Sequence, residues 1–266
     1  MKRAKKLMIF ISLVMLTIFI GGCGMMNKDD NQETNKKLNK EEQIKQKFSQ
    51  TLDMYPIKNL EDLYDKEGFR DEEFDKDDKG IWVISSSMKI QPKGKAMVSK
   101  GMVLFIDRNK KRATGKYIVR KSYDDHKTKL KVDNKEYPVE LKNNKIIPIE
   151  KLHDEKIKKE IKEFKFFSQY ADFKGLKNYK DGRISYNPNV PNYTAEYQIN
   201  NDDYNVKKLK EIYNLKTKET PELILKGTGK INGSSIGDKS IEYNFVQKED
   251  ENIYFTDSLT YEPSEE

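Results

Sequence analysis

The chain has 266 residues, of which 35% are hydrophobic, 36% charged and 11% aromatic, and its formal net charge is +7. The aromatic content is too high for a fully disordered chain, so a folded core is expected. One cysteine and two histidines exclude a disulfide framework and argue against a thiolate-rich or histidine-based metal centre.

The first residues have the pattern of an export signal. Four basic residues precede residue 7, and residues 7–20 are apolar except for Ser12 and Thr17. Fourteen helical residues span about 21 Å, against about 30 Å of hydrocarbon in a bilayer. The pattern therefore favours a signal peptide over residues 1–22 rather than a permanent transmembrane helix.

The apolar segment ends at Ile20-Gly21-Gly22-Cys23, which resembles the lipobox of bacterial lipoproteins. The resemblance implies cleavage between Gly22 and Cys23 and a diacylglyceryl thioether on the Cys23 sulfur, with acyl chains such as palmitate. Two acyl chains hold a protein firmly at a membrane, whereas one binds only marginally. An uncleaved signal or a buried, unmodified cysteine are the alternatives.

Cleavage would also change the charge balance. The signal carries four basic residues and no acidic ones, so the mature chain has 47 Lys and Arg against 44 Asp and Glu, a net charge of +3. A charge this small gives little global steering toward nucleic acid, and no nucleic-acid partner is expected.

The mature chain is expected to begin with a polar, disordered tether over residues 23–39, followed by a folded domain over residues 40–266. Ile44, Phe48 and Leu52 recur at helical spacing and predict a first helix that ends before Pro56. A short helix is expected at residues 59–66.

Alternating apolar residues then predict antiparallel strands. They occur at residues 80–90, 102–106 and 117–119, and a hairpin is expected between residues 130–132 and 137–141 across Asp133-Asn134. Asn143-Asn144 predicts the next turn, into residues 146–149.

A long amphipathic helix is expected from residue 154 to 171, and a further helix near residues 206–213. The remaining strands are expected at residues 193–199, 223–225, 241–246 and 253–261. The predicted fold class is α+β, with antiparallel β-meanders packed against a few amphipathic helices. It forms either one continuous domain or two similar halves, residues 40–150 and 151–266.

Several long segments resemble the staphylococcal tandem lipoproteins, also called the conserved staphylococcal antigen family. They are KNLEDLYDKEGFRDEEFDKDDKG (58–80), NNKIIPIE (143–150), KFFSQYADFKGLKNYKDGRISYNPNVPNYTAEYQ (165–198), LKGTGKINGSSIGDKSIEYNFV (225–246) and NIYFTDSLTYEPS (252–264). The resemblance implies an outward-facing protein anchored through Cys23, with links to host interaction and immune stimulation. It implies no catalytic residues.

Three other motifs fit ordinary structure better than a ligand site. The glycine-rich residues 227–235 lack the Lys-Ser/Thr order of a phosphate-binding loop and precede a strand, so a hairpin turn is expected. The acidic residues 71–78 lack calcium-loop spacing. His126 and His153 lie far apart in the sequence among charged residues, and no metal or cofactor is predicted.

One local charge asymmetry is informative. Residues 89–131 contain 14 Lys and Arg against 3 Asp, whereas residues 61–80 contain 10 acidic and 4 basic residues. The first segment predicts a basic hairpin surface that docks anionic surface polymers or acidic host proteins, with ordinary solvated strands as the alternative. Its candidate residues are Arg108, Lys110, Lys111, Arg112, Lys116, Arg120 and Lys121.

These observations lead to a membrane-anchored surface lipoprotein on the extracytoplasmic face that has no enzymatic activity and acts by display and contact. A lipid- or solute-binding lipoprotein is the alternative, since a curved antiparallel sheet covered by helices can hold an apolar ligand. A hydrolase would require a pocket that pairs a perturbed carboxylate with Lys or His. The sequence leaves the oligomeric state open.

Overall fold

The computed structural model describes residues 29–70, 74–125, 128–233, 236 and 238–264. The helices are α1 (Asp29–Leu52), α2 (Glu155–Glu163) and α3 (Tyr204–Ile212), with short 3-10 turns η1 (Leu60–Tyr64), η2 (Phe167–Gln169) and η3 (Leu176–Asn178). The strands are β1 (Ile81–Gln91), β2 (Met97–Asp107), β3 (Arg112–Asp125), β4 (Thr128–Lys142), β5 (Lys145–Pro148), β6 (Arg183–Asn187), β7 (Asn192–Gln198), β8 (Glu222–Thr228), β9 (Lys239–Gln247) and β10 (Asn252–Glu262).

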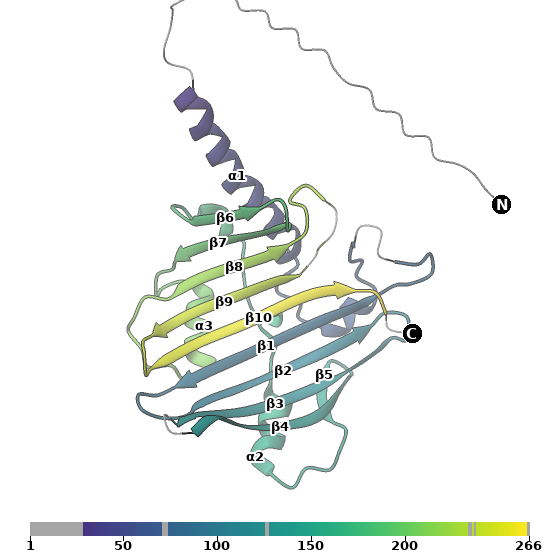
Figure 1. The fold of residues 1–266 in the computed structure, drawn as a ribbon. Helices are drawn as coiled ribbons and strands as arrows, with labels where there is room; N and C mark the ends of the chain where they lie inside the picture. Colours follow the sequence, from purple (N-terminus) through teal and green to yellow (C-terminus); the bar gives the residue numbers. More distant parts are fainter. Residues whose placement is uncertain (1–28, 71–73, 126–127, 234–235, 237, 265–266) are drawn as a thin grey trace, which may run out of the picture.

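All ten strands form one antiparallel sheet in the order β5-β4-β3-β2-β1-β10-β9-β8-β7-β6 (Figure 1). The two central strands are the first and the last of the chain, and they pair from Ile81↔Glu262 to Gln91↔Asn252. Because β5 and β6 lie at opposite edges, the segment between them must cross the whole sheet. This segment contains α2, η2 and η3.

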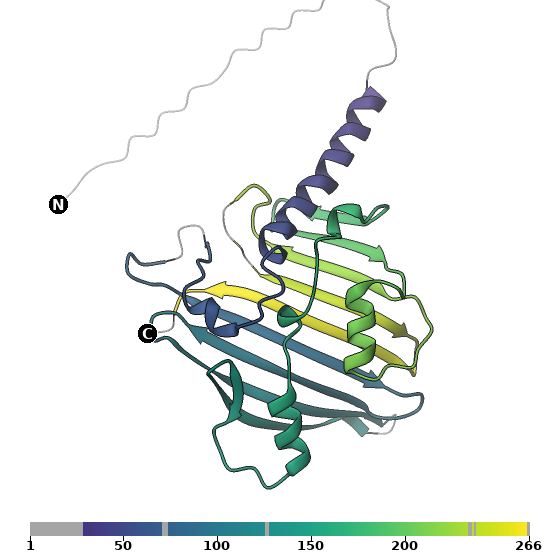
Figure 2. The same ribbon diagram turned by 180° about the vertical axis from the view of Figure 1, so that it is seen from behind.

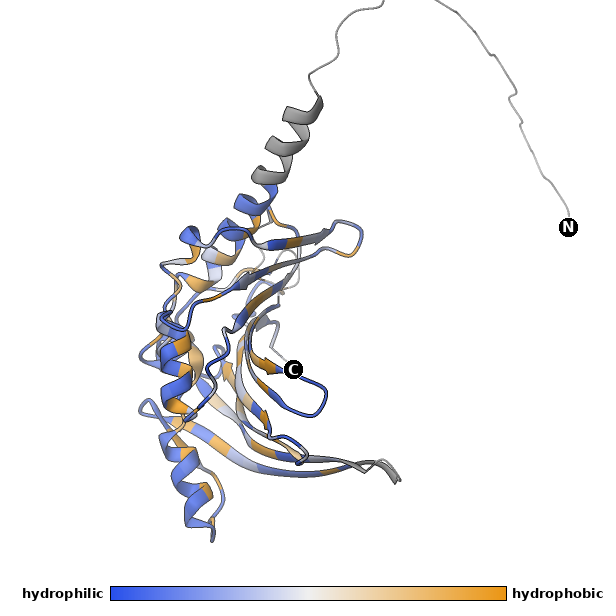
Figure 3. Ribbon diagram, turned by 90° about the vertical axis from the view of Figure 1, so that its left-hand side faces the viewer, coloured by the Kyte–Doolittle hydropathy of each residue, from blue (hydrophilic) through white to orange (hydrophobic). Residues whose placement is uncertain are grey.

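The helices lie on one face of the sheet, as Figure 2 shows from behind. In the side view of Figure 3 they line one side of a curved sheet whose opposite side is left open. We call these two sides the core face and the open face. The fold is α+β, as predicted, but β-structure dominates it and both predicted sub-halves share one sheet, so two separate similar halves are not shown.

Strand alternation determines which side chains reach each face. Along β1, Trp82, Ile84, Ser86 and Met88 are buried on the core face, and the residues between them point to the open face. The crossing segment closes this core, because the Phe167 ring lies 5.1 Å from that of Phe255 and 5.7 Å from that of Tyr243.

The capping residues of the two covering helices agree with their sequences. Asp154 accepts hydrogen bonds from the backbone of Lys156 and Ile157 at the start of α2. Asp203 does the same at the start of α3. Side-chain acceptors at this position satisfy backbone N–H groups that have no partner inside the helix.

Three local predictions were wrong. The predicted hairpin across Asp133-Asn134 is instead one continuous strand, β4, in which these residues pair with Lys121 and Arg120 of β3. Both residues are exposed at the outer part of the sheet, where a polar side chain remains hydrated in a strand.

The long helix expected over residues 154–171 ends at Glu163. Phe164 has an extended backbone, with φ −61° and ψ 134°, and the chain then crosses the core to η2. A regular helix would point neighbouring side chains about 100° apart. Because the chain changes direction here, Phe166 and Phe167 are both buried. In the other direction, α1 begins at Asp29 rather than near residue 40.

The other expected elements are confirmed. The strands around residues 80–90, 102–106 and 117–119 are present, and α3 covers the expected helix near residue 206. The strands on either side of the glycine-rich segment, β8 and β9, pair antiparallel, as a hairpin requires. Asn143 and Asn144 have φ values of 53° and 54°, as the turn between β4 and β5 requires. Within the described part of the chain, no helix is long and apolar enough to cross a membrane.

Candidate functional site

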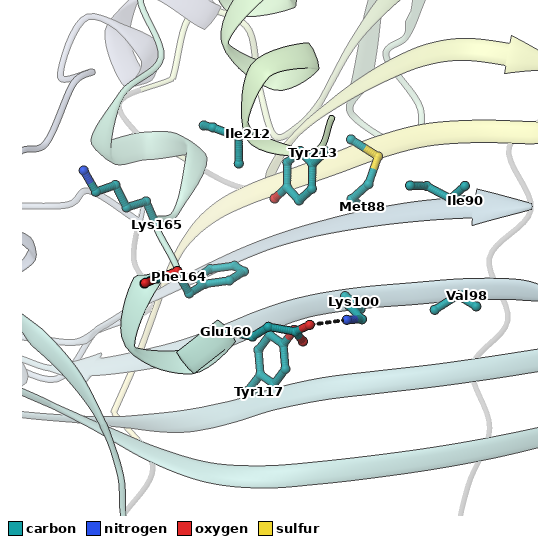
Figure 4. A pocket seen from close by; sticks show the side chains of 11 residues that line it. Met88, Ile90, Val98, Lys100, Tyr117, Glu160, Phe164, Lys165, Ile212 and Tyr213 are labelled. Carbon is teal, nitrogen blue, oxygen red and sulfur yellow. Dashed lines mark hydrogen bonds and ion pairs between the residues drawn. The ribbon is translucent and has the colours of Figure 1, made fainter. Parts of the chain in front are cut away.

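A cleft of about 550 Å³ lies on the core face, between α2 and α3 (Figure 4). We call it the apolar cleft. Its volume falls within the range of small-molecule binding sites. Its walls and floor are formed by Met88, Ile90, Val98, Lys100, Tyr117, Glu160, Glu163, Phe164, Lys165, Ile212 and Tyr213.

The cleft exists because the covering helices are short. Nine-residue helices such as α2 and α3 are about 14 Å long, whereas the eleven-residue strands β1 and β2 extend for about 36 Å. Ile90 and Val98, near the ends of these strands, therefore keep partial solvent exposure, and Ile212 at the end of α3 is 47% exposed.

At the polar end of the cleft, three side chains form hydrogen bonds and an ion pair with one another. The Lys100 ammonium lies 2.6 Å from Glu160 Oε1, and the Tyr117 hydroxyl donates to Glu160 Oε2 at 2.9 Å. Burial, followed by this hydrogen bond, raises the pKa of Tyr117 above its ordinary value, so the phenol stays protonated. The floor therefore presents a neutral group rather than an unpaired charge.

Tyr213 supplies a second phenol, from the end of α3. Burial raises its pKa above the ordinary value, with a smaller contribution from the charge of Asp257. Figure 4 shows its ring facing the cleft opposite Phe164. The lining thus offers aliphatic and aromatic surface, the Lys100–Glu160 ion pair, phenolic hydrogen-bonding groups and the two further charged residues Glu163 and Lys165. A mainly apolar lining with a few polar groups is suited to binding an apolar molecule.

A buried polar node lies near the cleft on the same face. Asp257 accepts hydrogen bonds from Ser86 Oγ at 2.5 Å and from the Tyr55 hydroxyl at 3.2 Å, and Ser86 Oγ in turn accepts one from the backbone N–H of Phe167. Burial raises the pKa of Asp257 to about 7, although both hydrogen bonds oppose the rise. The node ties β1 and β10 to the crossing segment.

The predicted basic surface is only partly assembled. Arg108 does not belong to it, because its side chain is buried and forms an ion pair with Glu67 at 2.6 Å. The same guanidinium donates to the Lys79 carbonyl and to the Tyr261 hydroxyl, both at 2.6 Å. Arg108 thus attaches the loop before β1 to the end of the sheet.

The other six candidates lie on the surface but point in different directions. Lys110 and Lys111 belong to the β2–β3 turn and pair with Asp107 at 3.1 Å and Asp65 at 3.0 Å. The remaining four are on β3, where alternation places Arg112, Lys116 and Arg120 on the open face and Lys121 on the core face.

The predicted lipidation and cleavage residues, Cys23 and Gly22, lie outside the described residues, as do His126 and residues 71–73 of the acidic segment. His153 is exposed in the loop before α2. Among the described residues, no cluster of three His, Cys, Asp or Glu side chains could hold a metal ion.

Sequence reasoning missed the apolar cleft. A signal for it was present, since apolar alternation in β1 continues to Ile90 whereas the stripe of α2 contains only Ile157 and Ile161 as buried residues. The periodicity of the sequence could not predict where along the strands the helices would lie.

The fold places the chain among β-dominated α+β proteins. The chain belongs to the Csa1 family, whose profile matches residues 40–264. This match confirms the resemblance to the staphylococcal lipoproteins described above.

Several full-length relatives come from staphylococci. An "Uncharacterized lipoprotein" of Staphylococcus epidermidis is 57% identical over 266 residues, covering 100% of both chains. An "Uncharacterized lipoprotein" of Staphylococcus aureus strain N315 is 55% identical over 267 residues, again covering 100% of both chains. A further Staphylococcus epidermidis relative, an "Uncharacterized protein", is 57% identical over 264 residues, covering 99% of this chain and 100% of the relative.

Proposed function

We propose that this protein is a lipid-anchored surface lipoprotein on the extracytoplasmic face of the cell membrane that acts by display and contact, without enzymatic activity. The observation that carries the proposal is the similarity, over the full length, to proteins named lipoproteins, in a chain whose single cysteine follows an apolar segment and two glycines. The partners are the membrane, through the lipid on Cys23, and host or cell-surface molecules.

The chemistry of the apolar cleft supports a binding role rather than catalysis. Its carboxylate Glu160 is engaged by Lys100 and Tyr117, and its lining contains no serine, cysteine or histidine. The cleft lining therefore lacks the Ser–His or Cys–His pair that activates many hydrolytic nucleophiles.

The anchor can be tested by comparing the unmodified chain with a Cys23→Ala variant in intact cells. We expect the unmodified chain in the membrane fraction, with a mass that lacks residues 1–22 and includes two acyl chains, and accessible to protease added outside the cells. Cys23→Ala should abolish acylation and this cleavage. An unmodified thiol on membrane-bound protein would refute the proposal.

The apolar cleft favours a second function, the binding of a lipid or other apolar solute. Its test is the fluorescence of 1-anilinonaphthalene-8-sulfonate added to the purified full-length chain. Val98→Trp should fill the cleft and reduce binding at least fivefold, whereas Val190→Trp, at a site that is 66% exposed, should leave binding unchanged. Equal binding by both variants would contradict this function.

A further inference from the structure

The open face has a basic row along β3, formed by Arg112, Lys116 and Arg120. Successive members are four residues apart, about 13 Å along an extended strand. Lys116 pairs with Glu136 at 2.7 Å, and Arg120 lies 3.5 Å from the neutral amide oxygen of Asn134. Neither guanidinium of this row forms an ion pair within 4 Å among the described residues, although the charge of Arg120 acts on Glu136 and helps to lower the pKa of that carboxyl.

A shallow hollow of about 470 Å³ lies at the Arg112 end of the row. Its lining brings Arg112 together with the ring of Phe105, which is 44% exposed, and with the hydroxyl of Thr114. Two carboxylates also reach it. Asp107 is paired with Lys110, and Glu262 lies at the rim. An exposed aromatic ring beside a guanidinium can receive the face of a ring-shaped group that bears an anion.

Small hydroxyl side chains lie on the same face on β1 and β10, with β2 between them and the row. On β1 and β10, Ser85 and Ser258 lie 2.7 Å apart and Ser87 and Thr256 2.9 Å apart, each pair joined through its oxygens. On β2, Gly101 faces Ser87 and adds no side chain at all. The open face therefore offers hydroxyl groups two strands away from the row, and Val103 of β2, which pairs with Lys116, lies between them.

Lys89 adds positive charge on the same face. Its ammonium lies 4.6 Å from the centre of the Tyr254 ring. Burial lowers its pKa, Glu242 opposes this effect, and Arg120 lowers it further, which places Lys89 within electrostatic reach of the basic row.

We propose that the open face binds an anionic polysaccharide, one sugar ring on Phe105 with its carboxylate or sulfate on Arg112, and the chain continuing along Lys116 and Arg120. The inference rests on the proposed contact function and names the partner's chemical class. The positive charge of the row selects an anionic partner, and the exposed Phe105 ring beside the Thr114 hydroxyl favours a sugar polymer over an acidic peptide.

The β3–β4 hairpin provides a matched control for total charge. Lys121, Lys131 and Lys135 are exposed on the same two strands but project from the opposite face, because the register pairs Tyr123 with Lys131 and Val119 with Lys135. A triple variant on either face removes three positive charges from the same hairpin. The total charge removed is therefore the same, although the open-face set contains two arginines and one lysine and the control set three lysines.

The experiment uses the full-length chain purified in neutral detergent and fluorescein-labelled dextran sulfate, followed by fluorescence anisotropy. The open-face variant Arg112→Gln/Lys116→Gln/Arg120→Gln should weaken binding at least tenfold, and Phe105→Ala about threefold. The control variant Lys121→Gln/Lys131→Gln/Lys135→Gln should change it less than twofold. Glu262→Gln should strengthen binding, and raising salt should weaken it because exposed charges are screened.

Three results would overturn the inference: no binding of dextran sulfate, equal losses in both triple variants, or equal affinity for poly-glutamate. Uncharged dextran of the same length should not bind, and binding as tight as that of dextran sulfate would remove the role of charge. Circular dichroism of each variant verifies its fold. The outcome is independent of the anchor, since Cys23→Ala fractionation can support the lipoprotein while this assay fails.

Discussion

Three consecutive serines on β1 show how differently the two faces of the sheet use the same side chain. Ser86 is fully buried on the core face, where it donates to Asp257 and accepts from the backbone of Phe167. Ser85 and Ser87 lie on the open face, where each forms a hydrogen bond to a hydroxyl of the neighbouring strand β10. These hydroxyls are also partly exposed to water. The face of the sheet to which a serine points, rather than its residue type, thus determines how much it contributes to the free energy of unfolding.

The core face also contains two buried ionisable groups that differ in how they are satisfied. The Asp257 carboxylate accepts hydrogen bonds from two donors, the hydroxyls of Tyr55 and Ser86. Lys239 is buried with its ammonium 5.8 Å from the centre of the Tyr193 ring, and that nitrogen has no hydrogen-bond partner among the described residues. Burial, with repulsion from Lys47, lowers the pKa of Lys239 to about 7. Burial thus shifts the pKa of both groups toward neutrality, upward for Asp257 and downward for Lys239.

The largest expected effect comes from the centre of the core face. Phe167 is fully buried, and its ring packs against those of Tyr170, Phe173, Tyr243 and Phe255. Phe167→Ala should lower the free energy of unfolding by about 3–5 kcal/mol, because it removes buried apolar surface and leaves a cavity. Urea denaturation followed by tryptophan fluorescence of Trp82 measures the loss.

Phe105→Ala is the matched truncation on the open face. Its ring is 44% exposed, so its removal should lower the free energy of unfolding by less than about 1 kcal/mol. Similar losses for both phenylalanines would mean that the open face is covered in solution, which would contradict the distinction between the faces.

The next effect concerns the pH dependence of stability. Asp257 has a pKa of about 7 in the folded chain and an ordinary value of 3.8, so the native state holds an extra proton between these values. The contribution of protonated Asp257 to the free energy of unfolding is therefore complete below about pH 4 and is lost as the pH rises through 7. Between pH 5 and 8 the loss should be about 2.5 kcal/mol.

Asp257→Asn isolates this contribution, because Lys239 titrates in the same range with the opposite effect. Its lowered pKa makes the folded chain more stable as the pH rises from 7 toward 10.5. Both effects remain in the unmodified chain, whereas the variant retains only that of Lys239. Urea titrations at pH 5 and 8 give the difference between the two proteins, and identical pH profiles would show that Asp257 is charged throughout.

The sequence allowed the two-faced sheet to be predicted, since the alternation in Trp82, Ile84 and Met88 directly reports burial on one side. The pairing of the first strand with the last could not be predicted, because a contact between Ile81 and Glu262 has no local signal. Arg108 was misassigned for a related reason: its partner Glu67 is 41 residues away, and nothing around Arg108 marks it as buried.

The smallest effects return to the serines. Ser86→Ala removes a donor from the buried Asp257 and an acceptor from the Phe167 N–H, so it should lower the free energy of unfolding by about 2 kcal/mol. Ser87→Ala breaks only a bond of 2.9 Å to Thr256 on the open face, and water replaces the lost partner. Its expected cost is about 0.5 kcal/mol or less.

A comparison of the two variants at pH 5 and 8 links this prediction to Asp257. Ser86 Oγ donates to the Asp257 carboxylate and lowers its pKa. Without that donor, the carboxylate in Ser86→Ala should protonate at a higher pH, so the variant should lose more stability than the unmodified chain as the pH rises toward 8. Ser87→Ala lies on the other side of the same strand and should follow the pH profile of the unmodified chain. If the pH profile of stability shifted as far in Ser87→Ala as in Ser86→Ala, the two faces of β1 would not be electrostatically distinct.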